Sequence, residues 1–191
     1  LNALERNIAT LAAFARERGL RLRPHAKMHK CAAVARLQLQ AGAVGLCVQK
    51  TGEAEALAAA GITDLYISNQ VIAPPKLARV AALARQVRLA IAVDSLLGVQ
   101  RLAEALRAAG SSLDVFVEID VGQGRCGVAP EQAGALVAAL RAAGLRFAGL
   151  QAYQGKAQHL RNPAERAAAI EQAAAAVRRA PWPHPRPARA A

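Results

Sequence analysis

Five basic or imidazole side chains fall within eight residues, from Arg23 to Lys30. Neighbouring positive charge disfavours the ammonium form of a lysine, so this crowding is expected to lower the pKa of Lys27 and leave its amine free to attack a carbonyl. The segment therefore predicts a Schiff-base lysine, with a solvated basic loop as the alternative. His25 and His29 could also ligate a metal together, but no third ligand lies nearby in the sequence.

A second segment, from Glu118 to Gly127, contains three glycines in the pattern G-x-G-x-x-G. A dinucleotide-binding fold places this pattern after its first strand, with an acidic residue about twenty residues later, and this sequence meets neither condition. We expect instead that the glycines let the backbone pass close to a ligand toward which Arg125 projects. The alternative is a tight turn in which Arg125 pairs with Asp120.

A third segment runs from Gln151 to His159, at the end of the last expected strand. Tyr153 supplies an aromatic ring and a hydroxyl, and His159 supplies a group that can exchange a proton near neutral pH. The alternative for His159 is an ordinary surface histidine. Weaker candidates at the ends of earlier strands are Gln49, Lys50 and Asn69.

Six short apolar runs, separated by helical patterns, would position these residues. They are Leu20–Arg23, Val44–Val48, Asp64–Ser68, Val87–Val93, Leu113–Ile119 and Phe147–Tyr153. Each is apolar almost throughout, as a strand covered on both faces of a parallel sheet requires. The amphipathic helices expected between them include Leu4–Arg18, Cys31–Gln40, Glu53–Ala59, Leu96–Ala109 and Glu131–Ala142. This α/β pattern has the period of a (β/α)8 barrel, in which ligands meet the loops at the carboxyl ends of the strands.

The composition fits one large globular domain and argues against several classes of protein. The 191 residues are 54% hydrophobic, but no apolar run approaches the roughly 18 to 20 residues that span a bilayer, so we expect no membrane partner. The formal charge of +12 comes mainly from arginines scattered through an alanine-rich sequence without a basic helix or stacking motif, so we expect no nucleic-acid partner. Three widely spaced cysteines predict reduced thiols and a cytoplasmic protein.

The last residues depart from the repeat. An alanine-rich stretch, 166–179, is followed by four prolines between Pro181 and Pro187, which exclude both a helix and a central strand. We expect a barrel domain over residues 1–177 and a disordered Pro/Arg/Ala-rich tail over residues 178–191. Because the chain begins directly in a helix and shows only six repeats, we also expect it to be truncated.

Four segments together resemble one family: Leu22–Lys30, Gly45–Glu55, Glu118–Gly127 and Gln151–His159. In this order they resemble the group of D-threonine aldolase, 3-hydroxy-D-aspartate aldolase and D-serine dehydratase. The resemblance implies a pyridoxal 5'-phosphate enzyme of the alanine racemase fold, with an incomplete (β/α)8 TIM-type barrel of about six β/α units as its N-terminal domain. The implied activity is a lyase that cleaves a D-3-hydroxy amino acid to glycine and an aldehyde.

The resemblance also implies roles for five residues. Lys27 would hold pyridoxal phosphate as an internal aldimine, Arg125 would approach the phenolic oxygen of the cofactor, and Tyr153 and Gln49 would lie against the cofactor. His159 would take the proton from the β-hydroxyl of the substrate before the Cα–Cβ bond breaks. A dehydratase would instead expel the hydroxyl, and a non-catalytic cofactor-homeostasis protein of this fold would only carry the cofactor.

The chain departs from the family pattern as well. Family members are longer and continue into further barrel strands, a glycine-rich loop for the cofactor's phosphate, and a β-rich domain whose His and Asp bind a divalent metal such as manganese. Those metal ligands are not in this sequence, and Met28 stands where the family has threonine. The family implies a homodimer, whereas we expect residues 1–191 alone to be poorly soluble and inactive, because an incomplete barrel exposes a sheet edge.

Overall fold

The computed structural model describes residues 1–182 and contains one sheet of five parallel strands. The strands are β1 (Leu46–Val48), β2 (Asp64–Gln70), β3 (Arg88–Val93), β4 (Asp114–Glu118) and β5 (Arg146–Gln151). They lie side by side in chain order, and each pairs in parallel with the next. This order is that of successive β/α units, as the sequence pattern predicts.

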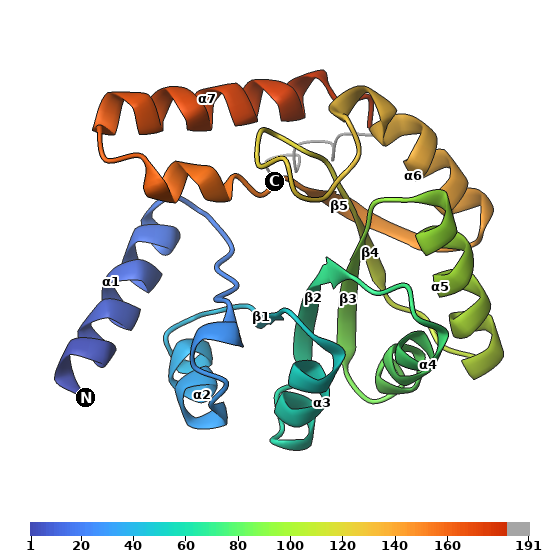
Figure 1. The fold of residues 1–191 in the computed structure, drawn as a ribbon. Coiled ribbons are helices and arrows are strands. Elements are labelled where there is room, and N and C mark those ends of the chain that lie inside the picture. Colours follow the sequence, from blue (N-terminus) through green and yellow to red (C-terminus); the bar gives the residue numbers. More distant parts are fainter. Residues whose placement is uncertain (183–191) are drawn as a thin grey trace, which may run out of the picture.

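Within residues 1–182, seven α-helices flank the strands, and α2 to α6 form an arc around the sheet (Figure 1). They are α1 (Asn2–Glu17), α2 (Ala32–Gln40), α3 (Thr51–Ala59), α4 (Pro74–Leu83), α5 (Leu96–Ala109), α6 (Ala133–Ala142) and α7 (Pro163–Arg179). Short 3-10 turns occur at η1 (Ala26–Met28), η2 (Pro130–Gln132) and η3 (Gly155–His159). Within residues 1–182, no helix has both the length and the apolar character needed to cross a membrane.

Local sequence explains where several helices begin and end. The Ser95 hydroxyl accepts a hydrogen bond from the Gly98 N–H at the start of α5, and the Asn162 side chain does the same for Ala164 at the start of α7. At the other end of α5, Gly110 adopts φ 58°, a left-handed conformation that ends the helix and costs glycine little. These capping bonds and the left-handed glycine define the helix ends and so the points at which the chain changes direction.

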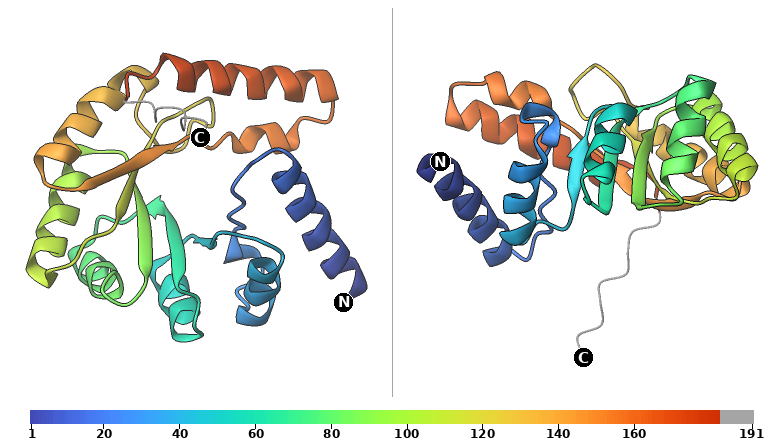
Figure 2. Two further views of the ribbon diagram at one scale, coloured as in Figure 1. Left: turned by 180° about the vertical axis from the view of Figure 1, so that it is seen from behind. Right: turned by 90° about the horizontal axis from the view of Figure 1, so that it is seen from below.

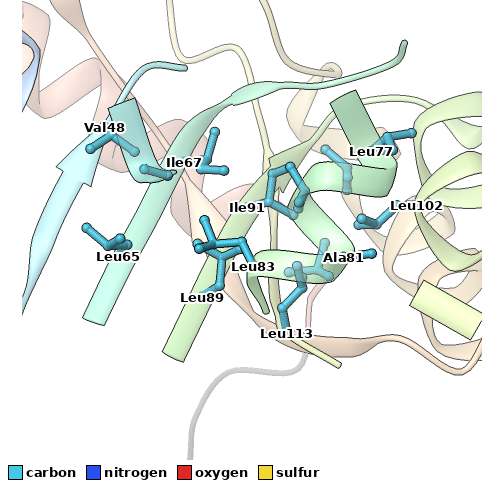
Figure 3. Packing of buried hydrophobic residues seen from close by; sticks show 14 of the residues in the cluster. Val48, Leu65, Ile67, Leu77, Ala81, Leu83, Leu89, Ile91, Leu102 and Leu113 are labelled. Atoms are coloured by element: carbon cyan, nitrogen blue, oxygen red, sulfur yellow. The ribbon is translucent and has the colours of Figure 1, made fainter. Parts of the chain in front are cut away.

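One face of the sheet packs against the helices. Leu65 and Ile67 of β2, together with Leu89 and Ile91 of β3, are buried with Leu77 of α4 in the largest apolar cluster (Figure 3). These strand residues are two positions apart, so their side chains point to the same side of the sheet. Burial of large apolar side chains stabilises this layer by roughly 1.5 to 3 kcal/mol for each residue.

The opposite, inner face of the sheet is aromatic and polar. Cys47 lies beside Tyr66 in the register of β1 and β2, and Glu118 lies beside Gln151 in that of β4 and β5. The rings of Tyr66 and Phe116 are in contact, with their centroids 4.9 Å apart. The expectation of strands that are apolar throughout is therefore wrong, because only the face toward the helices is an apolar layer.

The expected first strand, Leu20–Arg23, is not a strand. These residues run extended beside β1, where the Val44 N–H donates to the Leu22 carbonyl (2.9 Å) and the Cys47 N–H donates to the Pro24 carbonyl (2.8 Å). Pro24 has no N–H to donate in return, so only one isolated bridge forms, between His25 and Cys47. The sheet therefore has five strands where six were expected, and in the described residues β5 does not close onto β1.

The end of the described chain is packed against the barrel. Helix α7 continues to Arg179, past the expected domain boundary at residue 177. Ala180 is 1% exposed, and the Trp182 ring meets the Phe147 ring of β5 edge to face, with centroids 6.2 Å apart. Figure 2 shows α7 running alongside η3 at this end of the sheet. The rest of the expected tail, residues 183–191, lies outside the described residues.

A ladder of alternating charges crosses the amino-terminal edge of the sheet. It consists of Arg23, Asp64, Arg88, Asp114 and Arg146, the last four of which each begin a strand. Successive members are joined by ion pairs with N–O distances of 2.7, 3.6, 3.9 and 2.5 Å. The charge ladder links four neighbouring strands to the segment that precedes β1.

Candidate active site

A small cavity of about 50 Å³ lies at the carboxyl ends of the strands, where a barrel binds its ligands. Four of the five principal candidates from the sequence line it together: Lys27, Gln49, Arg125 and Tyr153. The remaining lining residues are His25, Ser68 and Gln151. Residues from five separate segments of the chain thus meet at one point, and four of these segments carry candidates from the sequence.

His25 positions Lys27 within this cavity. The His25 Nδ1 accepts a hydrogen bond from the Lys27 N–H (3.3 Å) at the start of η1, and its Nε2 lies 3.3 Å from the Ser68 hydroxyl. Ser68 in turn donates to the Val48 carbonyl (3.3 Å), so its oxygen is free to accept a hydrogen bond from the Nε2–H. The bonds therefore assign a neutral ring with the proton on Nε2. Burial, and the nearby charge of Lys27, hold the pKa of His25 below its ordinary value of 6.5.

The other charges of the basic segment are engaged elsewhere. Arg23 pairs with Asp64 at the amino-terminal edge, and the Lys30 ammonium lies 3.6 Å from the Glu53 carboxylate. Met28, at the position of the family's threonine, is exposed. From the basic segment, only His25 and Lys27 line the cavity. Its other positively charged residue besides Lys27 is Arg125, which comes from a separate loop.

The two histidines of this segment each accept a backbone hydrogen bond at Nδ1. The His29 Nδ1 accepts from the Cys31 N–H (3.1 Å), just as the His25 Nδ1 accepts from the Lys27 N–H. In the part of the chain that the structure describes, no three His, Cys, Asp or Glu side chains are arranged to hold a metal ion.

Arg125 reaches the cavity from a loop that two aspartates hold in place. Asp120 accepts from the Gly122 N–H (2.9 Å) and the Gly124 N–H (3.0 Å), and these bonds, that of Gly124 foremost, keep its pKa below the usual range. Asp94 accepts from the Gly127 N–H (3.1 Å). Because Asp120 is occupied by the backbone, Arg125 pairs instead with Glu118 (3.8 Å), contrary to the alternative that a tight turn suggested.

Arg125 also contacts the ring of Tyr153. The Arg125 guanidinium is 5.3 Å from the centroid of the Tyr153 ring, within the range of a cation–π contact. The Tyr153 hydroxyl accepts from the Gln158 side chain (2.7 Å). The ring rests on Gly155, where a Cβ would come within 2.6 Å of ring carbon Cε1, so any larger residue would displace it.

Gln49, Lys50 and Asn69 line a larger groove of about 710 Å³ between α3 and α4. Gln49 also lines the Lys27 cavity, so the two spaces share one wall. The backbone of Gln49 is held by the Glu53 carboxylate, which accepts its N–H at 2.9 Å.

His159 does not line the Lys27 cavity. It is the last residue of η3, and its side chain is exposed. It follows directly after Gln158, the partner of the Tyr153 hydroxyl. His159 is therefore near the site residue Tyr153 in sequence, but its side chain does not line the cavity.

The sequence analysis missed several residues of the inner face. Ser68 and Gln151 line the cavity, the Tyr66 hydroxyl donates to the Gln151 side chain, and the Gln70 side chain donates to Glu118. Burial is the main cause of the raised pKa of Tyr66. Their signal in the sequence was the period of two in Asp64, Tyr66, Ser68 and Gln70, which places polar or aromatic residues on one face of β2.

The cavity offers a primary amine, a guanidinium and an aromatic face within one small space. An amine that meets a carbonyl can form an imine, a guanidinium can bind an anionic oxygen, and a ring can lie against a planar ligand. This set of groups fits an anionic aromatic aldehyde such as pyridoxal phosphate. The neutral imidazole beside the amine adds no second charge to hinder that reaction.

Comparisons with known proteins agree with this geometry. The family model described as the alanine racemase N-terminal domain matches residues 1–190. A D-threonine aldolase of Arthrobacter sp. is 46% identical over 91% of this chain and 46% of its own length. A 3-hydroxy-D-aspartate aldolase of Paracoccus denitrificans is 42% identical over 94% of this chain and 48% of its own length.

Solved structures give the same result. The crystal structure of a D-threonine aldolase from Filomicrobium marinum superimposes with a TM-score of 0.93 at 48% identity, over 94% of this chain and 49% of that one. A D-threo-3-hydroxyaspartate dehydratase from Delftia sp. HT23 superimposes with a TM-score of 0.81 at 35% identity, over 96% of this chain and 51% of that one. The chain thus spans about half the length of the relatives it matches.

Proposed function

Because the chain belongs to the alanine racemase N-terminal domain family, we propose that it is the cofactor-binding barrel of a pyridoxal phosphate-dependent lyase acting on D-3-hydroxy amino acids. The products would be glycine and an aldehyde. The observation that carries the proposal is the meeting of Lys27, Arg125 and Tyr153 in one cavity at the carboxyl ends of the strands. Two relatives with D-3-hydroxy amino acid aldolase names support the substrate class.

Each cavity residue has a role in this proposal. Lys27 holds the cofactor through its amine, Arg125 binds its phenolic oxygen, and Tyr153 and Gln49 lie against it. Bound pyridoxal phosphate supplies an electron sink for the pair released when the Cα–Cβ bond breaks. His159, whose side chain is exposed, accepts the proton of the substrate's β-hydroxyl at one ring nitrogen.

The proposal extends to partners of the chain. The resemblance supports a cytoplasmic homodimer that uses a divalent metal. Free thiols at Cys31, Cys47 and Cys126 are compatible with a reducing compartment.

A dehydratase is the second candidate. It is supported by the dehydratase from Delftia sp. HT23, which shares the fold at 35% identity. A dehydratase would use the same Lys27 cavity, but the β-hydroxyl of the substrate would be eliminated and no aldehyde would be released. A non-catalytic carrier of the cofactor would need Lys27 and Arg125 but not His159.

Borohydride trapping tests the proposal. The full chain, in which residues 1–191 are continued by the second half that the relatives have, is incubated with pyridoxal phosphate, reduced, digested and mapped by mass spectrometry. D-threonine cleavage is followed by the release of glycine and acetaldehyde. We expect the adduct on the peptide that contains Lys27. The adduct should vanish in Lys27→Ala and persist in Lys156→Ala, which removes an exposed amine. An adduct on another lysine would contradict the proposal, and release of ammonia and a keto acid would favour the dehydratase.

A further inference from the structure

Glu118 is the one buried carboxylate among the described residues, with 3% of its surface exposed. A buried charge is costly unless other groups compensate it. Glu118 has two partners: the Gln70 side chain donates to Oε2, and the Arg125 Nη2 lies 3.8 Å from Oε1. Glu118 is the last residue of β4, and its partner Arg125 lines the Lys27 cavity.

The orientation of the Arg125 guanidinium depends on the groups around it. Its side chain is 45% exposed, and its loop fixes the backbone but not the guanidinium. The guanidinium has the Tyr153 ring 5.3 Å away and the Glu118 carboxylate 3.8 Å away. An exposed arginine loses rotamer freedom when it is held in one direction, so a fixed charge nearby is an effective means of holding it.

Gln70 fixes the carboxylate in turn. The ladder between β2 and β3 is irregular between Ile67 and Gln70, and Gln70 pairs with Ala92 after this irregularity. The small Ala92 side chain on the intervening strand leaves room for Gln70 to reach Glu118 on β4. The hydrogen bond engages Oε2 and leaves Oε1 to Arg125.

We infer that Glu118 is a positioning residue: held by Gln70, it directs the Arg125 guanidinium onto the Tyr153 ring and over the Lys27 cavity, where Arg125 can bind an anionic oxygen of the cofactor. This inference rests on the proposed function. It assigns to Gln70 and Glu118 a role in binding that works through Arg125 and not by contact with the ligand.

The direction of the effect separates this role from simple electrostatics. Removing a negative charge beside a site for an anionic ligand should by itself strengthen binding. If Glu118 acts by orienting Arg125, its replacement should weaken binding. A purely structural role would lower stability and would reduce binding equally whether or not Arg125 is present.

The test uses the full chain with Glu118→Gln, Glu118→Asp and Arg125→Met, and with Glu104→Gln as a control on the exposed side of α5. The fraction of chain that carries borohydride-trapped cofactor on Lys27 is measured against pyridoxal phosphate concentration. We expect Glu118→Gln to weaken apparent binding about tenfold, Glu118→Asp to recover part of the loss, and Glu104→Gln to match the wild type. In the Arg125→Met background, Glu118→Gln should weaken apparent cofactor binding by less than a further factor of about two.

A second measurement needs no cofactor. The rate at which phenylglyoxal modifies Arg125 is followed by peptide mapping, with Arg36 as the internal reference. Release of the guanidinium from Glu118 should accelerate modification of Arg125 several-fold in Glu118→Gln and in Gln70→Leu, which keeps the charge and removes only the hydrogen bond. Gln70→Leu also replaces Glu118→Gln if the latter does not fold, as thermal unfolding would show.

The outcomes are separable. Tighter or unchanged cofactor binding in Glu118→Gln, an equal loss in both Arg125 backgrounds, or an unchanged modification rate at Arg125 overturns the inference while the proposed function stands. If the wild type carries no cofactor on Lys27, the proposed function fails, and the modification rates then decide whether Glu118 holds Arg125.

Discussion

At the scale of single residues, the state of His25 decides how Lys27 is presented. Its Nδ1 accepts from the Lys27 N–H and its Nε2 faces the Ser68 hydroxyl, so the ring joins η1 to the end of β2. A proton on Nδ1 would remove the acceptor and break the first of these bonds. The neutral ring is therefore part of the site as folded.

This arrangement predicts a dependence of stability on pH. Because the pKa of His25 is lower in the folded chain than the ordinary 6.5, the unfolded chain binds more protons as the pH falls below that value. The free energy of unfolding should therefore decrease as the pH falls from about 7 to about 5, and the decrease should be shallower in His25→Gln. Urea unfolding across this range measures it. An equal slope in both proteins would contradict the assignment of a neutral His25.

A second prediction at this scale concerns His159. In the full chain, with the second half that the relatives have, His159→Ala should reduce aldol cleavage by about 100-fold or more, since it removes the proposed proton acceptor. Because His159 is exposed, its loss should change stability by less than about 0.5 kcal/mol and leave the trapped cofactor on Lys27 unaltered. Cleavage assays, trapping and thermal unfolding of one preparation give all three values. Undiminished cleavage would assign the proton transfer to another group.

At the scale of elements, the charge ladder connects strands that the apolar layer alone would allow to slide. Asp64 is 22% exposed and pairs with both Arg23 and Arg88. Its neighbour Gly45 leaves space for this pair, since a Cβ there would come within 2.2 Å of the Arg23 Nη1. The ladder thus fixes the extended segment beside β1, and through it the start of η1 and Lys27.

Asp64→Asn should destabilise the fold by about 2 kcal/mol, because it leaves a partly buried arginine without its ion pair. Glu171→Gln is the matched control: it breaks the pair with Arg178, whose two members are 63% and 72% exposed, and should cost less than about 0.5 kcal/mol. Denaturant midpoints measure both. Equal effects for the two variants would show that the ladder does not hold the sheet.

At the scale of the whole molecule, the sheet is open. Its order runs from β1 to β5, and within residues 1–182 no strand joins the two edges. The extended segment before η1 covers part of the β1 edge, while α1 leaves Leu11 and Phe14 about half exposed. Exposed strand edges and apolar side chains favour association between chains.

We therefore expect residues 1–191, produced alone, to be poorly soluble and to lack aldolase activity. The relatives that this chain matches are about twice its length. Light scattering and a D-threonine cleavage assay on the isolated segment test both parts. A soluble monomer that cleaves D-threonine would contradict this prediction.

The sequence by itself determined the type and order of most elements, and the loops that carry the site. Helix spacing, the glycine at the end of α5 and the apolar residues on one face of each strand are set by neighbours in the chain, so five of the six expected strands were found. The carboxyl ends of parallel strands meet at one edge of the sheet, so four residues could be assigned to one cavity there: Lys27, Gln49, Arg125 and Tyr153.

Only the tertiary structure decided which groups are partners. The Tyr66 hydroxyl and Gln151 are 85 positions apart, and Gln70 and Glu118 are 48 apart. Such pairs depend on the register between strands and on which face each side chain takes, and a shift of one residue would reverse the face. The choice of Glu118 over Asp120 as the partner of Arg125 was likewise fixed in three dimensions, because the loop backbone had already satisfied Asp120.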